Sequence, residues 1–185
     1  MKYSAIKNCD IANGEGVRVS VFVSGCNHHC KGCFNKETWD FNHGKTLTFE
    51  TVQDIGEMLE PDYISGLTVL GGEPLDPLNT NGVNFLLELV SMGINREKKN
   101  IWLYTGYTWD ELMDRIFKNG DTELRSILEY VDVLVDGRFI EEEKDISLVF
   151  RGSRNQNIID CKLSLRDSKE NFYVVYTYPD KYFKN

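Results

Sequence analysis

Hydrophobic and polar positions along the chain follow two periods in turn, and their succession indicates an α/β protein. Valines at every second position predict a first strand over residues 18–24. Short apolar runs predict further strands over 67–70, 101–104 and 131–135. Two later segments, 148–150 and 172–178, have β-like composition and are expected to form extra strands or a terminal hairpin.

Between these runs the apolar residues recur at the spacing of a helix. Val52, Ile55 and Leu59 mark one helical face, which Thr48 caps and Pro61 ends. Further helices are predicted over 83–92, over 108–117 behind a capping box, and over 121–128 behind Asp121 as its cap. The order β-α-β-α-β-α-α-β favours a parallel sheet with right-handed crossovers.

Two architectures fit this order: an open doubly wound sheet and a barrel. A complete eight-unit barrel usually takes about 250 residues, and this chain has 185. We therefore expect a partial, open parallel βα barrel over residues 1–160. Residues 161–185 would form a short irregular or hairpin extension, packed on the same domain.

Four unusual motifs directly follow the four predicted strands. In parallel α/β folds ligands bind at the edge where the strands end, so one site is expected there. The motifs, in strand order, are the cysteine loop from Cys26 to Cys33, Gly71-Gly72-Glu73-Pro74, Thr105-Gly106-Tyr107 and Asp136-Gly137-Arg138.

The cysteine loop carries the strongest chemical signal. Cys26, Cys30 and Cys33 are three of only five cysteines and have the spacing C-x3-C-x2-C, which is too tight for an ordinary disulfide framework. Thiolates that converge in this way hold iron–sulfur clusters. Three ligands for a four-iron cube would leave one iron open to an exogenous chelate, such as the amino and carboxylate groups of an amino acid.

Two other interpretations of the loop remain open. A structural zinc site could add His28 or His29 to the three thiolates, although each histidine alone is better interpreted as a polar loop residue. Alternatively, Cys9 or Cys161 could supply a fourth thiolate, which would make the protein an electron-transfer ferredoxin.

The other motifs are weaker signals. Gly71 and Gly72 form either a tight turn or a place where a ligand approaches the backbone, and Glu73 could accept a hydrogen bond from a ligand ammonium group. Asp136 and Arg138 form either a surface salt bridge or a contact to a ligand carboxylate or ribose. Two further features are the Thr105 hydroxyl, which is expected at the same edge, and a polar cluster that either completes the site or binds a partner: Arg151, Arg154, Asn155 and Gln156.

Charge and composition exclude several classes. The formal net charge is −8, and nucleic-acid binding needs clustered Lys and Arg. The densest acidic run, 141–143, is expected to be a solvated turn or helix end. No apolar run approaches the ~20 residues that span a bilayer, and the first residues contain no apolar signal region, so a cytoplasmic protein is expected.

The cysteine motif, followed one βα unit later by Gly71-Gly72-Glu73-Pro74, resembles the radical S-adenosylmethionine superfamily. Within it the chain is similar to the glycyl-radical activating enzymes, above all to those of the anaerobic (class III) ribonucleoside-triphosphate reductases, over residues 1–160. The further stretches that carry this resemblance are Asn13-Gly14-Glu15-Gly16-Val17-Arg18, Asn35-Lys36-Glu37-Thr38-Trp39, Tyr104-Thr105-Gly106-Tyr107, residues 133–139 and residues 150–156.

The resemblance implies a mechanism. Cys26, Cys30 and Cys33 would hold one 4Fe–4S cluster, and S-adenosylmethionine would chelate the fourth iron. One electron would cleave it to methionine and a 5′-deoxyadenosyl radical, which takes an α-hydrogen from a glycine of the partner reductase. An electron donor such as a flavodoxin is also implied.

The resemblance also assigns the remaining site residues. Gly71, Gly72, Glu73 and Pro74 would contact the methionine amino group, while Gly32 and Phe34 would line the adenine side. Thr105, Asp136 and Arg138 would contact the rest of the cofactor or the partner.

Two positions depart from the family pattern. Gly32 stands where the superfamily more often has an aromatic residue, and Glu15 stands where related activases often have proline. There is also no second cysteine-rich insert, which favours a single cluster. The competing functions are a small-molecule radical enzyme similar to the deazapurine-forming synthase, a non-enzymatic electron carrier and a zinc-stabilised interaction domain.

Overall fold

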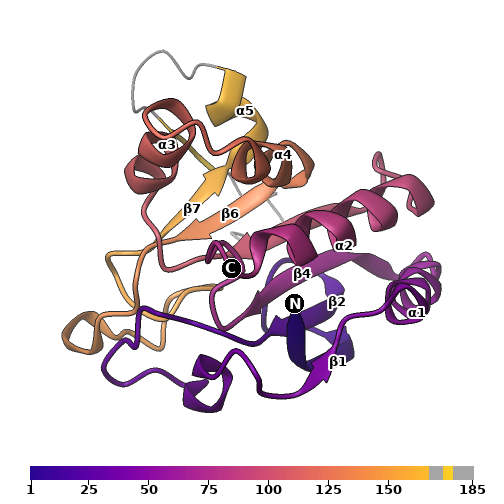
Figure 1. Ribbon diagram of the computed structural model, residues 1–185, viewed down its shortest axis with the longest axis horizontal. Helices are drawn as coiled ribbons and strands as arrows, with labels where there is room; N and C mark the ends of the chain where they lie inside the picture. The colour runs from indigo at the N-terminus through magenta and orange to yellow at the C-terminus, as the bar shows by residue number, and fades with distance from the viewer. Residues whose placement is uncertain (167–172, 177–185) are drawn as a thin grey trace, which may run out of the picture.

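The computed structural model describes residues 1–166 and 173–176, and these form one mixed sheet with helices packed against it (Figure 1). The strands are β1 (Lys2–Asp10), β2 (Val17–Val23), β3 (Lys45–Thr46), β4 (Ile64–Gly71), β5 (Asn100–Tyr104), β6 (Val133–Asp136), β7 (Asn157–Asp160) and β8 (Val174–Val175). The helices are α1 (Phe49–Leu59), α2 (Thr80–Gly93), α3 (Trp109–Phe117), α4 (Thr122–Tyr130) and α5 (Cys161–Arg166), with 3-10 turns η1 (Lys36–Trp39) and η2 (Glu141–Glu143).

The centre of the sheet is parallel and follows chain order. The full strand order is β3-β1-β2-β4-β5-β6-β7-β8, and β2, β4, β5 and β6 pair in parallel. Antiparallel strands flank this centre on both sides. A doubly wound sheet reverses its chain order at a switch point, and the four parallel strands here do not.

The α/β prediction and the four parallel strands are confirmed, whereas the flanking strands were largely missed. β1 has many polar residues and is only half-buried, so it lacks a clear alternating pattern. The strand predicted over 148–150 is wrong, because Phe150 lies in a loop and packs on Trp102 with ring centroids 5.4 Å apart. Of the segment 172–178, β8 is a strand as predicted, and residues 172, 177 and 178 lie outside the described residues.

The predicted helices are also confirmed, with caps that explain their boundaries. The Thr48 side chain accepts from Thr51 N, and Asp121 accepts from Leu124 N. At α3 both halves of the Thr108–Glu111 capping box are formed. Within residues 1–166 and 173–176, no helix is long and apolar enough to cross a membrane.

The two faces of the sheet are packed differently. One face carries Val21, Val69 and Leu103, which join the helices in the main hydrophobic core. On the opposite face, Trp102 is fully buried in a second cluster with Val133, Val135 and Ile158. The boundary predicted at residue 160 falls between β7 and α5, and the division itself stays a prediction.

A buried arginine crosses the second face. Arg18 is fully buried in β2, and burial lowers its pKa to about 10. Its guanidinium donates to Thr68 Oγ1 (2.6 Å), to the carbonyls of Leu67 (2.7 Å) and Asn100 (3.0 Å), and to the carbonyl of Glu15. Strands β2, β4 and β5 are therefore joined by side-chain bonds in addition to their ladders.

Glu15, one of the two departures from the family pattern, has a structural use. Its side chain is buried, and the Tyr176 hydroxyl donates to Glu15 Oε2 over 3.0 Å. Tyr176 directly follows β8. Glu15 thus links the turn before β2 to the segment that follows β8.

Candidate active site

A cavity of about 230 Å³ lies at the edge where the parallel strands end. Figure 1 shows the loop after β2 and the loop after β6 at the same end of the sheet. Eight predicted site residues line the cavity: Cys26, Cys30, Cys33, Phe34, Gly71, Gly72, Glu73 and Thr105. The single ligand edge expected from the four motifs is thus where the structure places the cavity.

Backbone bonds hold the cysteine loop against its neighbours. Gly25 N donates to Thr38 O (2.7 Å) and Cys26 N to Trp39 O (3.1 Å), so the loop closes on η1. Asn79, at the start of α2, donates its amide to the carbonyls of Ser24, Gly25 and Glu73. The loop therefore has a defined shape before any cofactor binds.

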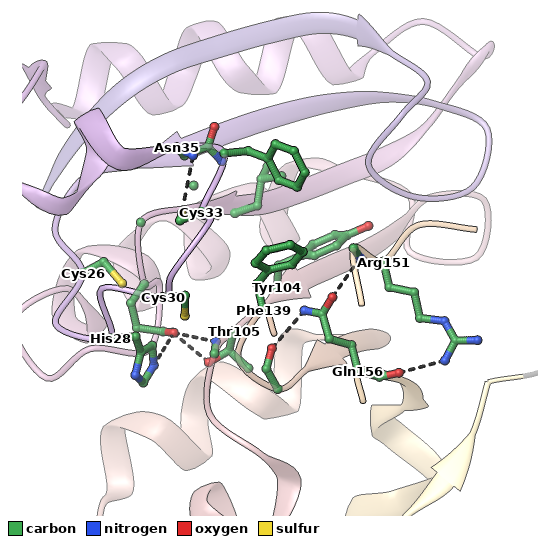
Figure 2. A pocket seen from close by; sticks show the side chains of 18 of the residues that line it. Cys26, His28, Cys30, Cys33, Asn35, Tyr104, Thr105, Phe139, Arg151 and Gln156 are labelled. Atoms are coloured by element: carbon green, nitrogen blue, oxygen red, sulfur yellow. Dashed lines mark hydrogen bonds and ion pairs between the residues drawn. The ribbon is translucent and has the colours of Figure 1, made fainter. Parts of the chain in front are cut away.

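Each of the three cysteine sulfurs receives backbone N–H groups. Those of His28 and His29 act on Cys26, that of Phe139 acts on Cys30, and Asn35 N lies 3.4 Å from Cys33 Sγ. Such hydrogen bonds favour the thiolate. The loop after β6 thus completes the surroundings of a cysteine from the loop after β2 (Figure 2).

Burial of the thiols has the opposite effect on their pKa. It raises the pKa of Cys26 to about 11 and also raises the pKa of Cys30. Without a metal both are therefore neutral thiols near pH 7. Metal binding has to displace their protons.

The two other cysteines lie away from the cavity. Cys9 is exposed on β1, and Cys161 is buried in the main core, where its thiol donates to Leu128 O. Neither lines the cavity. Over the described ranges, no three His, Cys, Asp or Glu side chains are grouped closely enough to hold a single metal ion, so the zinc interpretation finds no preformed ligand set in this part of the chain.

The two glycines after β4 are required by close chain packing. A Cβ on Gly72 would lie 2.5 Å from Gly25 O, and one on Gly71 would lie 2.7 Å from Val23 O. Gly72 N donates to Val23 O, and Glu73 N donates to Gly25 O. The tight-turn interpretation therefore explains both glycines without a ligand, while their backbone still lines the cavity.

The buried Glu73 carboxylate contacts three segments: the cysteine loop, the turn after β4 and the turn after β5. The residue is 1% exposed. Its Oε1 accepts from Thr105 Oγ1 (2.7 Å) and Leu75 N (2.9 Å), its Oε2 accepts from Gly106 N (2.6 Å), and His28 Nε2 lies 2.9 Å from Oε2. These bonds occupy the carboxylate oxygens that were predicted to bind a ligand ammonium group.

Asp136 and Arg138 do not line the cavity, and they do not form the alternative salt bridge with each other. The Asp136 carboxylate is buried, which raises its pKa, and it accepts from Trp109 N and from the backbone and side chain of Asn157. Arg138 instead pairs with Glu111 at 3.0 Å and is 42% exposed. Its charge lowers the pKa of Cys30, which places it near the site's rim.

Gly32 and Pro74 also lie outside the lining of the cavity. Gly32 has φ +74°, and a Cβ there would meet the Glu141 carboxyl at 3.0 Å, so an aromatic residue at this position would be strained. Phe34 lines the cavity, is 67% exposed and packs on Phe139, with the ring centroids 5.4 Å apart.

The acidic run 141–143 forms the 3-10 turn η2, and Glu141 and Glu142 form ion pairs with Lys31.

Half of the predicted polar cluster lines the cavity. Arg151 and Gln156 do so, and the Arg151 guanidinium donates a hydrogen bond to Gln156 O (2.8 Å).

Other residues of the cavity wall were not predicted from the sequence. His28 was interpreted as an ordinary loop residue, yet its side chain is only 9% exposed. The other lining residues that were not predicted as site residues are Asn13, Asn35, Trp39, Leu70, Tyr104, Gly106, Gly137, Phe139 and Gly152.

The raised pKa of Cys26 predicts a pH-dependent reactivity in the iron-free protein. With a pKa of about 11, about a thousandth of this thiol is ionised at pH 8. Alkylation by iodoacetamide should therefore accelerate about tenfold per pH unit up to pH 10. Peptide mass spectrometry after timed quenching measures the rate, and a rate that is flat between pH 8 and 10 would contradict the burial effect.

Comparison with known proteins agrees with this site. Residues 12–159 match the family model described as a 4Fe-4S single cluster domain. An anaerobic ribonucleoside-triphosphate reductase-activating protein of Haemophilus influenzae is 45% identical over 167 residues, which is 88% of this chain and 100% of that protein. Proteins of the same name from enterobacteria phage T4 and Escherichia coli K12 are 38% and 37% identical over 158 residues, covering 85% and 84% of this chain and 93% and 96% of their own lengths.

Proposed function

Because the chain belongs to the family of anaerobic ribonucleoside-triphosphate reductase-activating proteins, we propose that it is a radical S-adenosylmethionine activase. Its substrate would be a glycine of the anaerobic reductase. The observation that carries the proposal is the placement of three cysteines of one loop around one cavity, beside the Gly71–Gly72 turn. An electron carrier or a zinc domain needs neither this turn nor the adjoining cavity.

The residues present fit a cluster. Three thiols line one cavity, none is in a disulfide, and backbone N–H groups are directed to each sulfur. Cys26, Cys30 and Cys33 would hold the 4Fe–4S cluster. When bound, the reduced cluster supplies the electron that splits S-adenosylmethionine and so produces the radical that removes the glycine α-hydrogen.

The protein's own residues would position S-adenosylmethionine and shield it from solvent. The backbone around Gly71 and Gly72 offers the surface against which the methionine amino group would lie, with Glu73 as the brace behind it. Pro74 then shapes this turn rather than the contact itself. Phe34 would cover the adenine from the open side, next to Gly32, and Thr105 would help through its bond to Glu73.

Asp136 and Arg138 take different parts in this proposal. Asp136 holds the start of α3 and β7 in place, so its contribution to cofactor binding is indirect. Arg138, which is 42% exposed and whose charge acts on Cys30, would contact the partner.

The sheet is proposed to be a partial, open barrel of the radical S-adenosylmethionine type. Support comes from the parallel strands that follow chain order and from the cavity at their ends. An open edge leaves the cofactor side accessible, and the reductase itself would seal it from water. The proposal further includes residues 161–185 as an extension, a flavodoxin as electron donor and the cytoplasm as location.

The test is detection of a glycyl radical on the reductase. The anaerobically reconstituted protein, S-adenosylmethionine, a reductant and the anaerobic reductase are incubated together, and electron paramagnetic resonance is recorded. We expect a glycyl signal that needs all four components. Turnover of a small molecule without any protein partner would favour the deazapurine-synthase type of function instead.

A further inference from the structure

His28 lies between Cys26 and Cys30, and the chemistry above gives it no role. Its side chain is 9% exposed and lines the cavity together with Cys26 and Cys30 (Figure 2). Nε2 lies 2.9 Å from Glu73 Oε2, a close polar contact in which the N–H is not aligned for a hydrogen bond. A nearly buried histidine that contacts a buried carboxylate differs from an ordinary loop histidine, whose side chain is exposed to solvent.

The surroundings leave the ring little freedom. It meets the ring of Tyr107 edge-on at 4.6 Å. On the other side it touches the backbone of Gly106 so closely that a Cβ there would overlap the imidazole. His29, the next residue, is exposed and stacks on Trp39 instead.

Glu73 connects His28 to the ends of two strands. Its carboxylate already accepts from Thr105 Oγ1, Gly106 N and Leu75 N. The His28 ring lies on the remaining side, with Nε2 2.9 Å from Oε2, and a carboxylate has about four acceptor positions, so one is left for an approaching donor. The cysteine loop, the turn after β4 and the turn after β5 therefore meet on one buried group.

The backbone of His28 has a second task. Its N–H and that of His29 are directed at the Cys26 sulfur. The direction of these N–H groups depends on how the loop is held. His28 thus contacts Glu73 through its side chain and Cys26 through its backbone, so that a shift of the ring would also move the N–H group near Cys26.

We propose that His28 is a positioning residue of the cysteine loop, which holds Cys26 in place through its contact with Glu73. The inference deepens the proposed function, because it concerns the loop that would carry the cluster. It predicts that loss of the contact releases the loop even in the iron-free protein. Cys26 then becomes more accessible to a reagent in solution.

The experiment measures alkylation of Cys26 by iodoacetamide in the full-length, reduced, iron-free protein. His28→Leu keeps most of the ring's volume but cannot pair with Glu73, whereas His28→Gln keeps an N–H donor. We expect about tenfold faster alkylation for His28→Leu and a rate within about threefold of the unmodified protein for His28→Gln. His43→Leu, the same change in a loop outside the cavity, is the matched control and should leave the rate unchanged.

Two results would overturn the proposal: a His28→Leu rate within about twofold of the unmodified protein, or His28→Gln reacting as fast as His28→Leu. Circular dichroism melting checks that each variant is folded. If His28→Leu does not fold, His28→Asn takes its place, since its shorter amide does not span to Glu73, and an unchanged rate there has the same meaning. The measurement uses no cluster, cofactor or reductase, so it stands apart from any failure of the proposed function.

Discussion

Replacing Cys30 with alanine is expected to abolish the conversion of S-adenosylmethionine to 5′-deoxyadenosine. Cys30 lines the cavity with Cys26 and Cys33, and neither of the two remaining cysteines lines it. Two thiolates cannot hold the cluster in place of three. Iron analysis and chromatography of the reaction products after anaerobic reconstitution measure both losses.

Cys9→Ala is the matched control for this variant. Cys9 is exposed on β1, away from the cavity, so iron content and cleavage should stay at the level of the unmodified protein. Cleavage retained in Cys30→Ala would remove the ligand assignment. Loss of iron in Cys9→Ala would instead revive the four-thiolate electron carrier.

Gly72→Ala should destabilise the fold and displace the cysteine loop. The added methyl group would lie 2.5 Å from Gly25 O and 3.0 Å from Thr38 O, and both are backbone atoms held by other bonds. We expect the free energy of unfolding to fall by about 3 kcal/mol. Denaturant unfolding of the iron-free protein measures the change, and the reconstituted variant should hold less iron because the cysteine loop is displaced.

Gly56→Ala tests whether that loss is specific. Gly56 lies within α1, and a Cβ there meets no atom within 4 Å. Alanine favours a helix over glycine, so this variant should gain about 0.8 kcal/mol. A Gly72→Ala protein as stable as the unmodified one would mean that the turn after β4 can shift away from the cysteine loop.

Local patterns were sufficient to predict the helices and the parallel strands. Thr48, Thr108 and Asp121 cap their helices as expected, because capping depends on residues three positions apart. β1 and β7 were not predicted, because their formation depends on strands that are distant in the chain. They lie outside the parallel centre and owe their place to pairing with β2 and β6, and such pairing leaves little trace in a half-polar segment.

The same contrast applies to Glu73 and Asp136. Glu73 follows β4 and Asp136 ends β6, so both lie at the edge of the sheet where the cavity is found. What each carboxylate binds depends on donors far away in the chain: Gly106 and Thr105 for Glu73, Trp109 and Asn157 for Asp136. No local pattern encodes those partners.

The sequence by itself determined which groups the chain can offer to a cluster. Three cysteines at C-x3-C-x2-C spacing, followed by two glycines one βα unit later, predict a cluster with an open iron, because ligand number and spacing are properties of the chain. Only the tertiary structure decided how the loop is held. The backbone N–H of Phe139 reaches Cys30, and the Glu73 carboxylate meets His28, Thr105 and Gly106. These contacts exist only once parallel strands bring separate loops to one edge of the sheet.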